Sequence, residues 1–180
     1  MKTWIMLGSV LILIASCRPG QSWRKEQIEK KETALMNDAD AGRTDTAAVN
    51  SLLKSYETYV ADFPDDSVGA GYLFKAADFY RYMHRPAKSI VLYKKVYTNY
   101  TSLSKRPYAL FLQGFTFENE LGSLDSAKII YESFLAAYPN HAIARDVKAT
   151  LDNLGKTPEQ IIEEFQSRQQ QDSLPTAVNK

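Results

Sequence analysis

Cysteine is almost missing from this sequence, and the shortage excludes several kinds of chemistry. Cys17 is the single cysteine among 180 residues. A disulfide within the chain, a CxxC redox pair and a cysteine-rich zinc site are therefore excluded. Histidine is also scarce: only His84 and His141 occur, and neither has a cysteine or a carboxylate cluster at ligand spacing beside it. We expect no metal site and no cofactor.

The common catalytic signatures are missing as well. The sequence contains no Gly-rich phosphate loop, no GxSxG elbow and no HExxH pair. Asp65 and Asp66 are adjacent acids, but they precede a predicted helix and are interpreted as complements to its positive end rather than as a cation site. We expect neither enzymatic activity nor a small-molecule substrate, and an enzyme of unrecognised type is the least favoured hypothesis.

Neither a strong net charge nor a membrane-spanning run is present. Lys and Arg number 22 against 21 Asp and Glu, so a nucleic-acid partner has no electrostatic support. The apolar run over residues 4–15 is shorter than the roughly 20 residues that a membrane-spanning helix needs, so an uncleaved membrane anchor is the weaker interpretation. Because Lys2 precedes the run and small residues follow it, residues 1–16 are predicted to be a secretory signal peptide.

The end of that signal has a recognisable form. Ile14-Ala15-Ser16-Cys17 resembles the lipobox of bacterial lipoproteins, and the resemblance implies that Cys17 becomes the diacylated and N-acylated first residue. Two or more acyl chains give a stable membrane anchor. No acidic run follows Cys17, unlike the export signals of surface lipoproteins in Bacteroidetes. We therefore expect a protein anchored in the outer membrane and facing the periplasm.

The rest of the chain divides by composition. Residues 17–22 contain Pro19 and Gly20 and predict a short tether. Residues 23–43, rich in Lys, Glu and Gln, predict a separate N-terminal helix that ends at Gly42. Residues 44–168 are predicted to form the main domain, and the polar residues 169–180 a disordered tail.

The main domain shows helical periodicity throughout and no alternating strand pattern. Its first apolar stripe ends at Phe63 and Pro64, and similar stripes recur five times. Two pairs of stripes superpose without a gap at a constant shift, a period of 38, which places Ala76 on Gly114, Tyr93 on Tyr131 and Tyr100 on Tyr138. A fixed period of this size is typical of a solenoid. The first pair's closing helix matches that of the third at a shift of 75, so we expect about three helix pairs.

The repeated positions resemble the tetratricopeptide repeat. That repeat has a small residue midway along its first helix, a small residue and an aromatic four apart in the second, and then proline. Here those places hold Gly114, Ala127 with Tyr131, and Pro139; the preceding copy has Thr101 in place of proline. The period of 38 exceeds the family's 34. The resemblance implies an all-α, right-handed solenoid, and we expect its core at Leu53, Tyr56, Ala76, Tyr93, Phe117, Tyr131, Phe134 and Tyr138.

A closing helix is expected at the end of the repeats. Thr157 and Gln160 predict a reciprocal capping box at its start, with Pro158 in the first turn. Ile161, Ile162 and Phe165 give this helix an apolar edge, which we expect to cover the last repeat as a C-terminal cap.

The first helices of such a solenoid line its inner surface, so their residues off the core stripe are the candidate partner-binding groove. Mixed polar and aromatic side chains suit a peptide or protein, with Tyr82 as the expected anchor. The alternative is that these positions are a solvated face and that loops or edges bind. The groove residues are Tyr72, Lys75, Asp78, Tyr82, Gln113, Thr116 and Glu120.

The resemblance is strongest to periplasmic tetratricopeptide lipoproteins of outer-membrane assembly and envelope coordination in Bacteroidetes-type bacteria, which share the Tyr138-Pro139 ending. It implies a scaffold that binds other proteins of the cell envelope, with its membrane contact made through the lipid on Cys17. The alternative is a structural subunit of a larger envelope, motility or secretion complex. The identity of the partner would separate the two hypotheses.

Overall fold

The computed structural model describes residues 20–42 and 45–173, and all regular structure in them is helical. The chain divides into two compact units, residues 1–44 and 45–180. The all-helical prediction is confirmed. The helices are α1 (Gln21–Asp40), α2 (Thr46–Asp62), α3 (Val68–Tyr82), α4 (Pro86–Asn99), α5 (Arg106–Asn119), α6 (Leu124–Ala137), α7 (Ala144–Asp152) and α8 (Pro158–Ser173).

The first unit contributes α1. This helix begins at Gln21, so the predicted tether is helical in its last two residues. It ends as expected before Gly42, whose φ of 70° is the left-handed conformation that glycine adopts without strain. Lys30 and Glu26 form an exposed i,i+4 pair at 2.6 Å. The predicted signal peptide and Cys17 lie outside the described residues.

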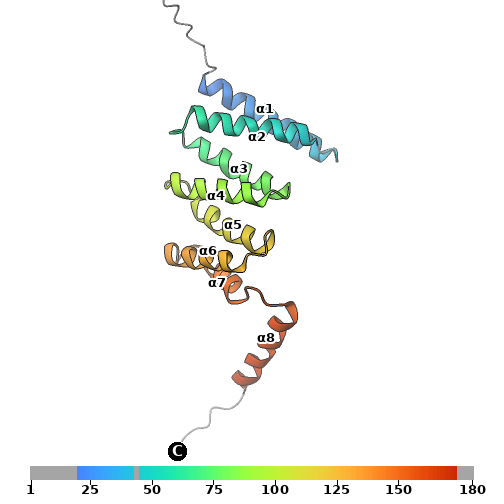
Figure 1. The fold of residues 1–180 in the computed structure, drawn as a ribbon, viewed down its shortest axis with the longest axis vertical. Helices are drawn as coiled ribbons and strands as arrows, with labels where there is room; N and C mark the ends of the chain where they lie inside the picture. Colours follow the sequence, from blue (N-terminus) through green and yellow to red (C-terminus); the bar gives the residue numbers. More distant parts are fainter. Residues whose placement is uncertain (1–19, 43–44, 174–180) are drawn as a thin grey trace, which may run out of the picture. The chain divides into compact units, whose positions relative to one another are not determined.

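The second unit stacks its helices in chain order (Figure 1). From α2 to α7, each helix packs on the next one along the chain. Asp45 caps the first of them by accepting a hydrogen bond from the Ala47 amide at 2.8 Å, as its side chain predicts. Consecutive packing of this kind is the architecture of a helical-pair solenoid, because each unit buries its apolar face only against its neighbours.

The helix boundaries reproduce the predicted period. Helices α3 and α5 begin at positions 68 and 106, and α4 and α6 begin at positions 86 and 124, so both pairs differ by the period of 38. Each second helix ends in the same way: Phe63, Tyr100 and Tyr138 have φ between −121° and −135°, and each donates its amide to the carbonyl four residues before. The three copies thus share both sequence and local conformation at their ends.

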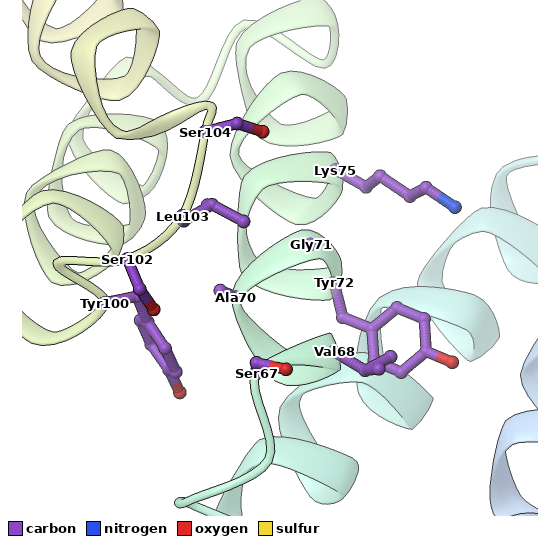
Figure 2. A pocket seen from close by; sticks show the side chains of 10 residues that line it. All are labelled: Ser67, Val68, Ala70, Gly71, Tyr72, Lys75, Tyr100, Ser102, Leu103 and Ser104. Carbon is purple, nitrogen blue, oxygen red and sulfur yellow. The ribbon is translucent and has the colours of Figure 1, made fainter.

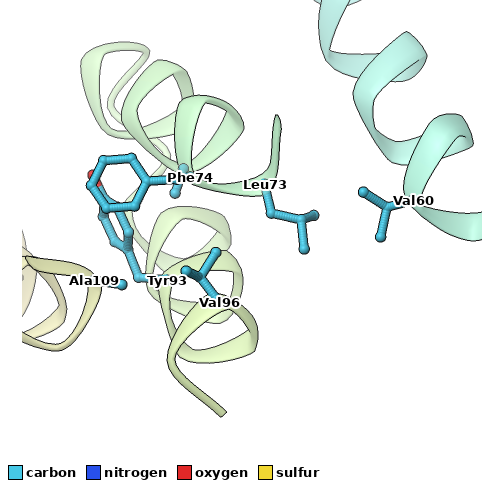
Figure 3. Packing of buried hydrophobic residues seen from close by; sticks show 7 residues of the cluster. Val60, Leu73, Phe74, Tyr93, Val96 and Ala109 are labelled. Atoms are coloured by element: carbon cyan, nitrogen blue, oxygen red, sulfur yellow. The ribbon is translucent and has the colours of Figure 1, made fainter. Parts of the chain in front are cut away.

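Two aromatic-rich clusters lie in the interior of the part of the second unit that the structure describes. One joins Val60 of α2 to Leu73, Tyr93 and Ala109 on the next three helices (Figure 3). The other is centred on Tyr131 and Phe134. Six of the eight predicted core residues are buried, whereas Phe117 and Tyr138 are only partly buried at the edge of the second cluster.

Gly114 shows why a small residue occupies the middle of α5. A Cβ at this position would lie 2.6 Å from the Tyr131 ring. The predicted role of the small residue is therefore confirmed, since Gly114 lets α5 approach α6 closely.

The C-terminal helix forms as predicted but does not cover the stack. Its capping box is present: the Thr157 amide donates to Gln160 Oε1 at 2.9 Å, and the Gln160 amide to Thr157 Oγ1 at 3.3 Å. Ile162 and Phe165 nevertheless stay 56% and 58% exposed. Helix α8 also continues to Ser173, so residues 169–173 are helical, contrary to the predicted tail boundary.

Candidate protein-binding surface

Two of the seven predicted groove residues are accessible on the first helix of a pair. Tyr82, at the end of α3, is 71% exposed, and Lys75, two turns earlier, is exposed as well. Both side chains are therefore exposed to solvent.

The prediction that Gln113 and Thr116 line the groove is wrong. Both are buried, and their side chains turn back onto their own helix: Gln113 Nε2 donates to the Ala109 carbonyl at 3.2 Å, and Thr116 Oγ1 to the Leu112 carbonyl at 2.7 Å. Helix α5 packs on both α4 and α6. These two neighbours cover more of the surface of α5 than a single apolar stripe predicts. Gln113 and Thr116 therefore cannot face a partner.

Tyr72 and Asp78 take part in the packing, although neither is fully buried. The Tyr72 ring stacks on Tyr56 at 5.1 Å and meets Tyr59 edge-on at 5.0 Å. The Asp78 carboxylate accepts a hydrogen bond from the hydroxyl of Tyr93. These two side chains hold α3 against α2 and α4 respectively.

The bond between Tyr93 and Asp78 has a counterpart in the next repeat. Tyr131, one period later, donates its hydroxyl to Glu118 Oε2 at 2.7 Å. Burial raises the pKa of both tyrosines, and the adjacent carboxylates raise it further. Both tyrosines therefore remain neutral hydroxyl donors to a carboxylate at physiological pH. In the second pair Thr116 occupies the position equivalent to Asp78 and the acceptor Glu118 lies two residues later, so the repeat register alone does not predict the acceptor.

Tyr82 belongs to a group of side chains that the sequence did not single out. The Arg81 guanidinium lies 4.7 Å from the centre of the Tyr82 ring and 5.6 Å from that of Phe115 on α5. Glu120 lies 4.0 Å from Arg81 and 3.9 Å from His84. We call Arg81, Tyr82, His84, Phe115 and Glu120 the Arg81 cluster. It brings together the predicted residues Tyr82 and Glu120.

The cluster has a buried donor at its centre. Within the described residues, Arg81 Nε is buried without a hydrogen-bond partner. Arginine over aromatic rings gains cation–π energy, and its planar group suits recognition of carboxylates and aromatic side chains. Phe115 and Arg81 could have been found from the sequence only by knowing how α3 and α5 face each other.

A second feature of the surface is a hollow of about 570 Å³ beside α3. Figure 2 shows its lining, which includes Tyr72 and Lys75 from α3 and Ser102 and Ser104 from the loop before α5. Gly71 contributes no side chain, and a Cβ there would meet nothing within 4 Å. Lys75 and Tyr72 thus adjoin a hollow that lies at the other end of α3 from Tyr82.

Comparison with known proteins agrees with this geometry. A family model described as tetratricopeptide repeat matches residues 108–141, the α5–α6 pair. The matched copy is the one that carries Pro139; the preceding copy, with Thr101 at that place, lies outside the matched range. No curated protein matches the chain significantly. The second unit is therefore a tetratricopeptide-like solenoid, an architecture whose general role is protein–protein interaction.

The described part of the chain contains neither a metal-binding cluster nor a membrane-spanning helix. No cluster of three His, Cys, Asp or Glu side chains there could hold a metal ion. No helix among the described residues combines the length and the apolar character needed to cross a membrane.

Proposed function

We propose that this protein is a lipid-anchored periplasmic scaffold for cell-envelope assembly, and that it binds a protein partner through the Arg81 cluster. The observation that carries the proposal is Tyr82, an aromatic side chain 71% exposed beside the guanidinium of Arg81. Tyrosine and arginine are enriched among the few residues that dominate binding energy at interfaces. Phe115 supplies an apolar floor, and Glu120 with His84 a polar rim.

The chemistry of the cluster suggests how a partner is recognised. A partner side chain that displaced water from Tyr82 would gain apolar contact with its ring, and a carboxylate or carbonyl could approach the part of the Arg81 side chain that stays accessible. Lys75 lies two turns away and would affect association rate and selectivity rather than the energy at the centre.

The decisive experiment is crosslinking in membranes followed by co-purification. The pair Tyr82→Ala with Lys75→Glu should abolish recovery of the partner while helical content and melting temperature stay nearly unchanged. Ile129→Ala with Lys128→Glu is the matched control, because Ile129 is 62% exposed on α6, a second helix. Undiminished recovery by the first variant would move the binding site to the loops, α1 or α8.

A structural subunit of a larger envelope, motility or secretion complex is the second candidate. Ile162 and Phe165 favour it, because a helix with two large apolar side chains in water commonly buries them in an assembly. The recovered partner separates the candidates: an envelope-assembly factor supports the first, and a fixed-stoichiometry component of a machine the second.

A further inference from the structure

Charge is distributed unevenly along a chain that is nearly neutral overall. Residues 79–117 contain seven Lys and Arg and no Asp or Glu. Arg106 is used internally, since it donates to the Tyr97 carbonyl at 2.8 Å and lies 4.4 Å from the Tyr97 ring centre. Arg81 is held in its cluster, and Lys105 lies over the Phe74 ring. The remaining four cations are exposed at the start of α4 and along it: Arg85, Lys88, Lys94 and Lys95.

Three of these cations surround an exposed valine. Lys88, Val91 and Lys95 follow one another at helical spacing, with Lys94 one turn from Val91, and Val91 is 63% exposed. Among the ion pairs found within residues 20–42 and 45–173, none involves Lys88, Lys94 or Lys95. We call Lys88, Val91, Lys94 and Lys95 the basic face of α4.

The next repeat shows that the fold does not require cations at these positions. One period later, on α6, Ile129 replaces Val91 and Glu132 replaces Lys94. Ile129 keeps the exposure of its counterpart at 62%, and Glu132 lies 4.0 Å from Lys128 in an i,i+4 pair. The exposed apolar residue is common to both repeats, but the unbalanced positive charge belongs to α4 alone of the two.

An apolar hollow of about 320 Å³ adjoins the basic face. It is lined by Glu57 of α2, Tyr80 of α3, and Ala87, Lys88, Val91 and Leu92 of α4. The carboxylate of Glu57 is engaged, because it accepts the Tyr80 hydroxyl at 2.9 Å, and Lys88 Nζ lies 5.1 Å from the centre of the Tyr80 ring. The hollow thus offers aliphatic and aromatic surface with lysines beside it.

We propose that the basic face of α4 and the adjoining hollow bind an acidic protein segment that carries an apolar anchor residue. Carboxylates of the segment pair with Lys88, Lys94 and Lys95, and the anchor enters between Val91, Leu92 and Tyr80. Complementary charge provides fast encounter and selectivity, and apolar burial provides the holding energy. This surface belongs to a second helix and is distinct from the Arg81 cluster of the proposed function.

A membrane surface is the less suitable ligand. An anionic bilayer would use the lysines alone, whereas the hollow is concave and extends past α4 to Tyr80 and Glu57. A protruding side chain fits such a hollow, as in helix-in-groove and pocket recognition of peptides.

Fluorescence anisotropy with synthetic peptides tests the proposal on the purified full chain. The probe is a labelled peptide of Asp and Glu with one central Leu, and the comparison peptide has Ser in place of Leu. The Leu peptide should bind roughly tenfold more tightly, a difference that corresponds to about 1.4 kcal/mol. Affinity should fall as salt is raised. Equal binding of the two peptides would overturn the role of the hollow.

Charge reversal locates the site. The triple variant Lys88→Glu, Lys94→Glu, Lys95→Glu should lose binding by roughly tenfold or more, and the milder Lys88→Gln with Lys95→Gln should weaken it less. The control Lys54→Glu, Lys128→Glu, Lys148→Glu makes the same change in net charge at other exposed lysines and should leave affinity nearly unchanged. Equal loss in both triple variants would show nonspecific attraction and overturn the site.

Two further measurements distinguish this proposal from binding to a membrane and from binding at the Arg81 cluster. Vesicles of phosphatidylglycerol should bind more weakly than the Leu peptide; stronger vesicle binding, lost in the α4 triple variant, would make the face a membrane surface and overturn the proposal. Tyr82→Ala should leave peptide affinity unchanged. A loss there would assign the peptide to the Arg81 cluster instead.

Discussion

At the scale of single residues, the tyrosines that join helices carry both apolar area and a polar bond. Tyr131 is fully buried, touches Phe111 and the Gly114 backbone region, and donates to Glu118. Tyr93 does the same with Phe74 and Asp78. In both cases the aromatic ring fills the space between helices, and the hydroxyl donates a hydrogen bond to a carboxylate at the border of that space.

Truncating Tyr131 should be among the most damaging changes in the domain. Tyr131→Ala leaves a cavity between α5 and α6 and should lower the free energy of unfolding by about 3 kcal/mol. Tyr131→Phe keeps the ring and should cost about 1 kcal/mol. Urea unfolding measures both. A loss below about 0.5 kcal/mol for the alanine variant would contradict the wedge role.

The same tyrosine predicts a dependence on alkaline pH. Folding raises the pKa of the Tyr131 hydroxyl above its unfolded-state value of about 10. The stabilisation that the protonated hydroxyl gives to the folded state is therefore complete below about pH 10 and is lost as the pH rises towards the folded-state pKa. Above pH 10 the unfolded chain releases this proton and the folded chain retains it, which lowers stability by about 1.4 kcal/mol per pH unit. Tyr131→Phe should flatten the fall measured between pH 9 and 11; an unchanged slope would exclude Tyr131 as a source.

His84 is a residue in a conformation that suits glycine better. Its φ is 54°, and Gly122, one period later, has φ 60° at the equivalent turn. Because a side chain incurs a steric penalty in the left-handed region, His84→Gly should raise unfolding free energy by up to about 1 kcal/mol. His84→Val should lower it instead. Denaturant unfolding of the pair decides the matter, and destabilisation by glycine would show that contact with Glu120 outweighs the strain.

At the scale of elements, the C-terminal helix is the least integrated part of the second unit. Its capping box and the Lys156–Glu164 pair at 2.7 Å are local. Ile162 and Phe165 are exposed, whereas α7 places Val147 in the cluster with Tyr131 and Phe134. The solenoid therefore ends its shared core at α7.

Removing α8 should leave the stack intact. A chain that ends at Lys156 loses little buried apolar area, so its melting temperature should fall by less than about 2 °C. Val147→Asp, which puts a charge into the core from the preceding helix, should lower it by far more. Differential scanning calorimetry compares the two. A large drop on truncation would show that α8 does cover the last repeat, as its sequence pattern suggested.

At the scale of the whole molecule, the proposed attachment through Cys17 determines where the solenoid acts. Cys17→Ser should move the protein from the membrane fraction to the soluble fraction, since a single polar substitution would remove the site of acylation. The folded domain should keep its melting temperature. Retention in membranes after a high-salt wash would contradict lipid anchoring, and protease shaving of intact cells that removed the domain would contradict the periplasmic orientation.

The repeat period and most of the helix limits were available from the sequence because they depend on local signals. The signals that start or stop a helix act within one helical turn, as at Gly42, Asp45, Pro64 and Thr157. Recurrence at a fixed period identifies equivalent positions whatever residues surround them. A stripe of apolar residues identifies the direction of the core. It does not say how many other helices press on the same element.

The number of helices that pack on each element was decided only by the tertiary structure, and it changed the candidate site. Helix α5 lies between α4 and α6, so Gln113 and Thr116 became buried although they stand off the apolar stripe. Arg81 and Phe115 are distant in the sequence and meet only because α3 and α5 face each other. The sequence by itself determined the helices, their order and their period; packing between helices determined which side chains remain free to bind, because solvent access depends on contacts that no local pattern encodes.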